Sequence, residues 1–209
     1  LKRLRFVTSH PRDMNEDLIQ LFGQEEKLMP YLHLPIQSGS NKILKKMNRG
    51  HTVEYYLDII SRLKKIRPEI AISGDFIVGF PGETEVDFQK TLDVCKIIKY
   101  SQAYSFKYSP RTGTPSFEMK DIPDDIKSNR LAKLQETIFL YQQQFQQNLI
   151  GSVQAVLIEK IGKFEDQYVG RTPYMNPVVL NSKQNQIGKI IPVKINSTNG
   201  LSLSGEYVT

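Results

Sequence analysis

The chain has 209 residues and a formal net charge of +6, with 39% hydrophobic and 24% charged residues. This length and composition are typical of a globular protein with one ordinary domain and a small second one. No apolar run approaches the ~20 residues that a membrane-spanning helix needs, so we expect no membrane partner. The single cysteine, Cys95, excludes an intramolecular disulfide and indicates a reducing, cytoplasmic setting. The basic balance is compatible with binding nucleic acid, although many proteins without that function are as basic.

In chain order, the first half alternates apolar strands with helices. Residues 4–9 predict a strand, and Asp13 or Asn15 could cap a helix that runs to Gly23. Further strands are expected at residues 31–37, 70–78 and 102–108, separated by helices at residues 41–47, 53–66 and 84–99. The crossovers are long enough to join parallel strands. This order predicts part of a parallel α/β barrel, whose functional face lies at the C-terminal ends of its strands.

The most informative stretch is DFIVGFPGET, which runs from Asp75 to Thr84. Strand parity places Asp75 and Ile77 on one face and the apolar residues between them on the other. An acid inside such a run is expensive to bury unless it has a partner. Gly79 lets the backbone approach a ligand, and Thr84 begins the next helix with a capping-box pattern. This is where α/β proteins place ligands, although a generic turn with a surface Asp would have the same residues.

Two other strands end in similar polar loops. Residues 31–41 place His33 and Gln37 on one face and lead towards Arg49. A lone strand histidine is more often a hydrogen-bonded core residue than a base, and we favour that interpretation for His33. Residues 108–115 form the third loop, YSPRTGTP.

The second half of the chain changes in composition. Residues 109–123 are rich in Pro, Gly, Ser and Thr and predict a loop, and residues 124–149 predict an amphipathic helix that Gly151 ends. Short β-branched runs are then expected as strands at residues 154–158, 167–170, 178–180, 190–195 and 201–208. Short strands at this spacing suggest a small five-stranded barrel. We therefore predict two domains, residues 1–150 and residues 151–209.

The motifs LHLPIQSGS, KKMNRGHT, DFIVGFPGET, FKYSPRTGTP and GRTPYMN together resemble those of the radical SAM methylthiotransferases. The resemblance implies an α/β plus all-β fold, with a partial radical SAM (β/α) barrel followed by an OB-like TRAM barrel that binds RNA. It covers the C-terminal half of the family, because the cluster-binding CxxxCxxC motif is absent here. Cys95 has no partner cysteines, and we expect a packed thiol that holds no metal. We therefore expect no catalytic residue within this chain.

The resemblance also implies S-adenosylmethionine as cofactor, with two 4Fe-4S clusters in the full-length enzyme. Arg49 could hold the methionyl carboxylate as a bidentate fork. Asp75 could accept from a hydroxyl or the α-amino group, and Gln37 could lie beside the ribose. Ile77 and Gly79 are candidates for the shelf under the adenine. The alternatives are that Arg49 pairs with Asp75 or solvent for structural reasons, and that Ile77 and Gly79 are ordinary strand residues.

Two more places near the strand ends remain open at this stage. Thr8 or Ser9 could contact the ribose, but the parity of the first strand does not decide between them. Tyr108, Arg111 and Thr114 lie where a substrate would approach, and Arg111 could contact the RNA backbone. An exposed loop arginine without a function explains Arg111 equally well.

As to function, the resemblance implies a transferase that adds a methylthio group to carbon 2 of N6-isopentenyladenosine next to the anticodon. The expected partner is a tRNA anticodon stem-loop, contacted by Lys160, Lys163 and Lys189 of the small barrel, and the full-length enzyme is expected to be monomeric. The chain alone is expected to be inactive. The alternatives are a methylthiotransferase for threonylcarbamoyladenosine or for a ribosomal protein, and a non-catalytic RNA-binding fragment.

Overall fold

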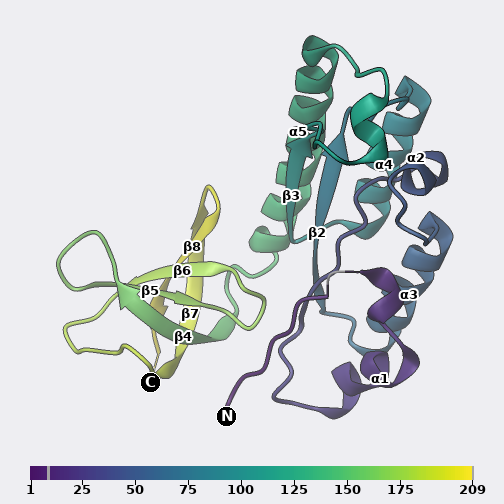
Figure 1. The fold of residues 1–209 in the computed structure, drawn as a ribbon. Helices are drawn as coiled ribbons and strands as arrows, with labels where there is room; N and C mark the ends of the chain where they lie inside the picture. The colour runs from purple at the N-terminus through teal and green to yellow at the C-terminus, as the bar shows by residue number, and fades with distance from the viewer. Residues whose placement is uncertain (9, 209) are drawn as a thin grey trace.

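The computed structural model describes residues 1–8 and 10–208 (Figure 1). Within these residues, a helix-covered parallel sheet is followed by the long helix α5 and a closed β-barrel. The helices are η1 (Pro11–Asp13), α1 (Glu16–Gln24), α2 (Asn41–Lys46), α3 (Val53–Ile66), α4 (Glu85–Ile98), η2 (Pro115–Glu118) and α5 (Asp124–Gln147). The strands are β1 (Tyr31–His33), β2 (Ala71–Val78), β3 (Gln102–Lys107), β4 (Val153–Ile161), β5 (Gln167–Arg171), β6 (Pro177–Asn181), β7 (Ile190–Asn199) and β8 (Ser202–Tyr207). No helix in this described part is long and apolar enough to cross a membrane.

The sheet is parallel, in the order β1-β2-β3. The prediction of a strand at residues 4–9 is wrong for the described residues 4–8. This segment makes only isolated bridges, from Leu4 to Leu28 and from Val7 to His33. Val7 comes three positions after Leu4, whereas their partners Leu28 and His33 are five positions apart. The register therefore shifts between the two bridges, and no regular ladder forms along the segment.

Strand β1 is also shorter than the predicted strand at residues 31–37. The chain leaves β2 after His33 and returns at Gln37, which bridges to Phe76. The path from His33 to Gln37 has one residue more than the facing path along β2, as in a bulge. Pro35 has no N–H to donate to the ladder, and Gln37 takes a positive φ of 76°. The break therefore turns Gln37 differently from a regular strand residue.

Helices α1, α3, α4 and α5 pack their apolar residues against one face of the sheet. From β2, Ile72, Phe76 and Val78 enter this core, as parity predicted. The phenol oxygens of Tyr56 and Tyr100 lie 3.0 Å apart inside it, and Tyr56 donates to the carbonyl of Leu34 at 2.8 Å. Burial raises the pKa of both phenols, so both remain neutral donors within the core.

The small barrel closes in the strand order β4-β5-β6-β8-β7. Alternate residues of its strands point inward and form a separate apolar core, which includes Val156, Ile158, Val193 and Leu203. The pairing is antiparallel except between β6 and β8, which are parallel. The five-stranded barrel expected from short strands at this spacing is confirmed.

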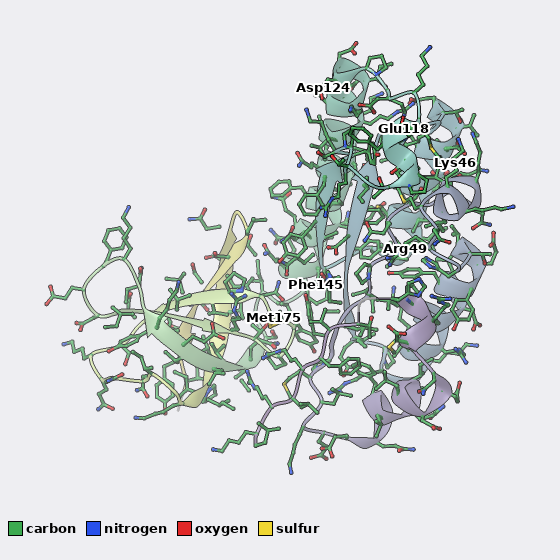
Figure 2. All side chains as sticks on the ribbon, in the orientation of Figure 1. Lys46, Arg49, Glu118, Asp124, Phe145 and Met175 are labelled. Atoms are coloured by element: carbon green, nitrogen blue, oxygen red, sulfur yellow. The ribbon has the colours of Figure 1, made fainter. Side chains whose placement is uncertain are left out.

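Besides the chain connection at the end of α5, ring packing and hydrogen bonds join the barrel to the rest of the molecule. The Tyr174 ring lies edge-on to Phe145 of α5, with centroids 5.7 Å apart, and Figure 2 labels Phe145 and Met175 at this junction. The guanidinium groups of Arg3 and Arg5 donate to the carbonyls of Arg171 at 3.2 Å and of Thr172 at 3.0 Å. The GRTPYMN segment is thus part of the junction between the two parts.

Candidate functional site

The predicted cofactor residues meet where β2 leaves the sheet. The Gln37 amide donates to the carbonyl of Asp75 at 2.9 Å, and the Ile77 amide donates to the carbonyl of Gln37 at 2.9 Å. The side chains of Asp75 and Ile77 are half-buried, on the face opposite to the buried Phe76. The structure therefore brings the backbone of Gln37 alongside Asp75 and Ile77, whose side chains lie on the open face of the sheet.

His33 orients the Asp75 carboxylate. One ring nitrogen, Nε2, lies 3.4 Å from Asp75 Oδ2, and the other, Nδ1, lies 3.0 Å from the hydroxyl of Ser73. The ring also lies edge-on to Tyr104, at 6.3 Å between centroids. The prediction that His33 is hydrogen-bonded is confirmed, but the residue is half-buried and does not belong to the core. His33 itself holds the Asp75 carboxylate in place.

Arg49 lies in a tight loop that follows α2. Its backbone amide donates to the carbonyl of Leu44 at 3.0 Å, and its carbonyl accepts from His10 Nε2 and, at 3.3 Å, from His51 Nδ1. The two imidazole rings pack edge to face, 5.0 Å apart. His10 Nδ1 accepts from the backbone N–H of Arg12 at 3.1 Å, which fixes the tautomer that donates from Nε2. Two histidines missed by sequence reasoning therefore hold the Arg49 backbone.

The Arg49 side chain points back towards the strand ends. Its Nη2 donates to the carbonyl of Pro35 at 3.4 Å, and Figure 2 labels Arg49 next to the sheet. Partial burial and the nearby Arg12 lower the pKa of this guanidinium, whereas the charge of Asp75 opposes that shift. A half-buried guanidinium beside a carboxylate remains charged and presents a fork that matches an anionic group.

The loop after Gln37 is fixed by the buried carboxylate of Asp87. It accepts from the hydroxyls of Ser40 and Thr84, each at 2.7 Å, and from Lys42 Nζ at 2.9 Å. Burial alone would raise the pKa of Asp87, but these hydrogen bonds lower it well below its usual range. The capping box predicted at Thr84 is confirmed, and the same carboxylate positions the loop beside Gln37.

Gly79 lies beyond this group of residues, and the packing of α5 explains why this position is a glycine. Its φ is +73°, and a Cβ there would overlap the side-chain stem of Lys127 on α5. Its amide donates to Glu83 Oε2 at 2.7 Å, and Arg130 of α5 pairs with that same oxygen at 2.8 Å. The glycine therefore lets α5 pack closely on the turn, whatever else it contacts.

The predicted RNA-contacting residues fall in both parts of the molecule. Arg111 is exposed in the loop after β3, where the Thr114 hydroxyl donates to its carbonyl at 2.7 Å. Lys160 and Lys163 are exposed at the β4–β5 end of the barrel, and Lys189 precedes β7 beside Ile158. Figure 1 shows the β4–β5 and β6–β7 loops projecting away from the sheet. The three lysines thus share one end of the barrel, whereas Arg111 lies elsewhere.

Several other predictions near the strand ends have clear outcomes. Thr8 is buried and its hydroxyl donates to the carbonyl of His33 at 3.2 Å, whereas Ser9 lies outside the described residues. The Tyr108 ring packs edge-on against Phe80, at 4.9 Å. Cys95 is fully buried, and burial raises the pKa of its thiol to about 12, which confirms a packed thiol. No group of three or more His, Cys, Asp or Glu side chains could hold a metal ion within residues 1–8 and 10–208.

The structure thus combines a parallel sheet whose strands end in polar loops with a closed five-stranded barrel. Residues 1–95 match the Radical SAM superfamily, and residues 147–208 match the TRAM domain. The chain therefore combines a radical SAM region with a TRAM domain, and the predicted fold class is confirmed.

Comparison with curated proteins makes the resemblance specific. The chain is 57% identical, over its whole length, to a protein of Rickettsia rickettsii (strain Sheila Smith) named tRNA-2-methylthio-N(6)-dimethylallyladenosine synthase. It covers 47% of that protein, so it spans about half the length of the curated relatives it matches. The predicted resemblance to the C-terminal half of the radical SAM methylthiotransferases is confirmed.

Solved structures with the same fold are more distant. Coproporphyrinogen III oxidase from Escherichia coli, described as a radical SAM enzyme, superposes with a TM-score of 0.51 at 17% identity. That match covers 82% of this chain and 46% of the oxidase. The archaeal Elp3 of Methanocaldococcus infernus gives a TM-score of 0.50 at 19% identity, over 66% of this chain and 32% of Elp3. At these identities the likeness concerns the fold alone.

Proposed function

We propose that this chain is the C-terminal part of a tRNA methylthiotransferase that modifies carbon 2 of N6-isopentenyladenosine next to the anticodon. The name of the Rickettsia relative and its identity to the whole chain support this reaction. We also propose that residues 1–150 form one domain with the cofactor wall and residues 151–209 a second domain that contacts RNA. The protein would act in the cytoplasm as a monomer.

The observation that carries the proposal is the meeting of Gln37, Asp75 and Ile77 at one strand end, with Arg49 directed towards them. These residues fit S-adenosylmethionine in chemical type. The cofactor has a carboxylate and an ammonium group, a ribose diol and a planar purine. The site offers a half-buried guanidinium, an oriented carboxylate, a side-chain amide and an apolar strand residue.

Each residue then has a defined task. Arg49 binds the methionyl carboxylate, and the two histidines on its carbonyl keep the loop in place. Asp75, oriented by His33, accepts a hydrogen bond from the ammonium group or a hydroxyl. Gln37 contacts the ribose, and Ile77 supports the purine. Gly79 contributes less directly, since its amide is already bonded to Glu83.

S-adenosylmethionine, when bound with an iron–sulfur cluster, would supply the radical chemistry of the reaction. The full-length enzyme would hold two 4Fe-4S clusters. Cys95 is unsuited to be a ligand, because burial raises the pKa of its thiol and metal binding needs the thiolate. The residues of this chain therefore bind and orient the cofactor and do not hold the clusters.

The RNA would be contacted by both parts. Lys160, Lys163 and Lys189 lie at one end of the TRAM barrel, a position suited to phosphate contacts with an anticodon stem-loop. Arg111 is exposed after β3 and could bind the backbone near the reacting nucleotide. Phosphate contacts of this kind position RNA without reading its sequence.

The test uses the product of the complete reading frame. Arg49→Ala should weaken S-adenosylmethionine binding by ~1.5–3 kcal/mol, the range for a hydrogen bond to a charged group, as measured by calorimetric titration. Arg62→Ala is the matched control, because Arg62 pairs with Glu16 and Asp58 on the surface of α3. Equal cofactor affinity in the two variants would remove Arg49 from the site. Mass spectrometry of tRNA nucleosides after reaction would identify the modified adenosine.

A further inference from the structure

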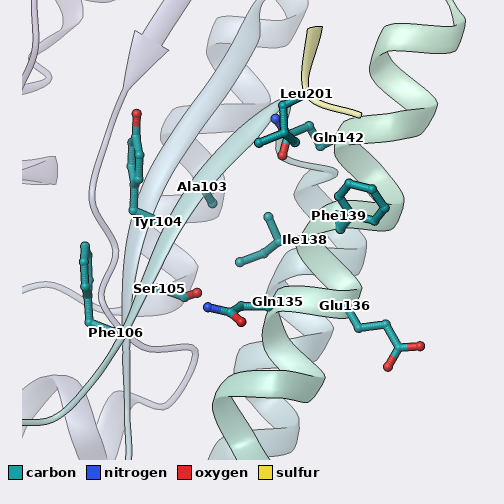
Figure 3. Close-up of a pocket in the computed structure, with 10 residues that line it drawn as sticks. All are labelled: Ala103, Tyr104, Ser105, Phe106, Gln135, Glu136, Ile138, Phe139, Gln142 and Leu201. Carbon is teal, nitrogen blue, oxygen red and sulfur yellow. The ribbon is translucent and has the colours of Figure 1, made fainter. Parts of the chain in front are cut away.

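We propose that Tyr104 and Phe106 of β3 form an aromatic slot that binds the target base of the RNA, and this rests on the proposed function. Both side chains are exposed, by 48% and 55%, on the open face of the sheet. Figure 3 shows them on one side of β3, whereas Ala103 and Ser105 point to the other side, towards α5. Sequence reasoning placed a strand here but gave these two rings no role.

The position of the rings connects them to the cofactor wall. In the register of β2 and β3, Asp75 faces Tyr104 and Ile77 faces Phe106. Two of the residues proposed to bind S-adenosylmethionine, Asp75 and Ile77, therefore each have an aromatic neighbour on the adjacent strand. A base held against these rings would lie beside the cofactor, as the transfer of a group to that base requires.

The placement of the rings suits a planar base. Two residues along a strand span roughly 6.6 Å, and both side chains leave the same face. The two rings are therefore neighbours on one face of β3 and together offer an aromatic surface to a planar base. Base–aromatic stacking is also how proteins hold single bases that have left their own stack.

Tyr104 is held in place before any ligand arrives. Gln102 Nε2 donates to its phenol oxygen at 2.7 Å, and the edge of His33 packs against the ring at 6.3 Å. A ring that is already fixed loses little conformational entropy when a base stacks on it. This favours a binding function over an exposed aromatic residue without a partner.

The charges around the strand ends favour a nucleic-acid occupant. The segments that follow the strands carry basic residues, namely Lys42, Lys45, Lys46, Arg49, Arg111 and Lys120. Of these, Lys42 is paired with Asp87. Arg49 is assigned to the cofactor, which leaves Lys45, Lys46, Arg111 and Lys120 as cations suited to the phosphates on either side of a base that enters the slot.

The experiment measures binding of two stem-loop RNAs to the product of the complete reading frame by fluorescence anisotropy. One RNA carries an adenosine at the target position, and the other has an abasic ribose there. We expect the unaltered protein to prefer the adenosine RNA by roughly 5- to 150-fold, the range for stacking of a base on aromatic side chains. In the Tyr104→Leu, Phe106→Leu double variant this preference should fall to about 2-fold or less, with abasic binding unchanged.

Two controls separate stacking from folding. Phe139→Leu removes another exposed aromatic ring, on α5, and should keep the full preference. The variants Tyr104→Phe and Phe106→Tyr retain the rings and should also keep it. S-adenosylmethionine affinity should be the same in all variants.

The outcomes separate this inference from the proposed function. A leucine double variant that keeps the preference, or that loses cofactor affinity instead, overturns the aromatic slot and leaves the proposed function standing. The same follows if the unaltered protein binds both RNAs tightly and equally. If the unaltered protein binds neither RNA, the proposed function fails and the slot fails with it.

Discussion

The buried ion pair between Glu83 and Arg130 should be a main support of the turn that follows β2. Arg130 Nη1 donates to Glu83 Oε2 at 2.8 Å and to the carbonyl of Glu83 at 3.1 Å. The same Glu83 oxygen accepts from the Gly79 amide at 2.7 Å. The pair therefore joins α5 to the turn, and the substitution Arg130→Met would separate the two while keeping an unbranched side chain of similar shape.

The expected cost follows from burial. The Glu83 side chain has 0% exposure and that of Arg130 has 8%, so the variant would leave a carboxylate buried without its cation. Removing one partner of a buried pair typically destabilises a protein by about 3–5 kcal/mol. For a chain of this length that corresponds to a loss of roughly 6–20 °C in Tm.

The cost should depend on pH in a defined direction. Burial raises the pKa of Glu83, and Arg130 opposes that effect. Without Arg130 the pKa of folded Glu83 rises further above its unfolded value. The folded variant then prefers the protonated form of Glu83. Its stability is therefore lost as the pH rises through the folded pKa of Glu83 and recovers as the pH falls. The deficit of the variant should be smaller near about pH 5 than near about pH 8.

Urea unfolding at both pH values measures these effects, with Arg62→Met as the control. Arg62 pairs with Glu16 at 2.6 Å and with Asp58 at 3.1 Å, but both carboxylates are more than half exposed and the Arg62 side chain is 35% exposed. Surface pairs of this kind contribute roughly 0–1 kcal/mol. Adding Glu83→Gln to Arg130→Met should recover part of the loss, because the buried charge is removed. Equal stability of Arg130→Met and Arg62→Met at the higher pH would refute the argument.

Three further predictions concern other parts of the chain. Thr84→Ala removes the N-cap of α4 and should destabilise the protein by ~0.5–2 kcal/mol in the same unfolding assay. An unchanged free energy of unfolding would contradict this prediction. Cys95 should react with a thiol reagent only on unfolding, since burial raises its pKa to about 12, and rapid reaction in the folded protein would contradict this. Replacing Lys160, Lys163 and Lys189 with Gln should reduce the slope of log affinity for a stem-loop against log salt by roughly 2, and an unchanged slope would exclude them from phosphate contact.

Much of the candidate site could be predicted from local sequence patterns. Parity along the DFIVGFPGET stretch correctly separated Asp75 and Ile77 from the buried Phe76, because each strand residue alternates between faces whatever its partners are. The capping box at Thr84 was also predictable, because a cap involves neighbours three residues apart. The five barrel strands followed from the spacing of β-branched runs and turns.

Pairing between distant segments was less predictable. Residues 4–8 have the composition of a strand, but their partners lie on both sides of Pro30, so the register shifts and no ladder forms. Pro35 shortened β1 for a similar reason, since it supplies no N–H at a position that alternation alone would assign to the strand. A one-residue change in register reverses which face a side chain occupies, and composition does not report it.

The sequence by itself determined most of the elements, their order and the residue types at the strand ends, because periodicity, capping and turn chemistry act within a few residues. Only the tertiary structure decided that His10 and His51 hold the carbonyl of Arg49, and that the side chain of Lys127 requires glycine at position 79. These contacts join residues between 2 and 48 positions apart. They depend on how helices and loops pack against the sheet, which local patterns do not specify.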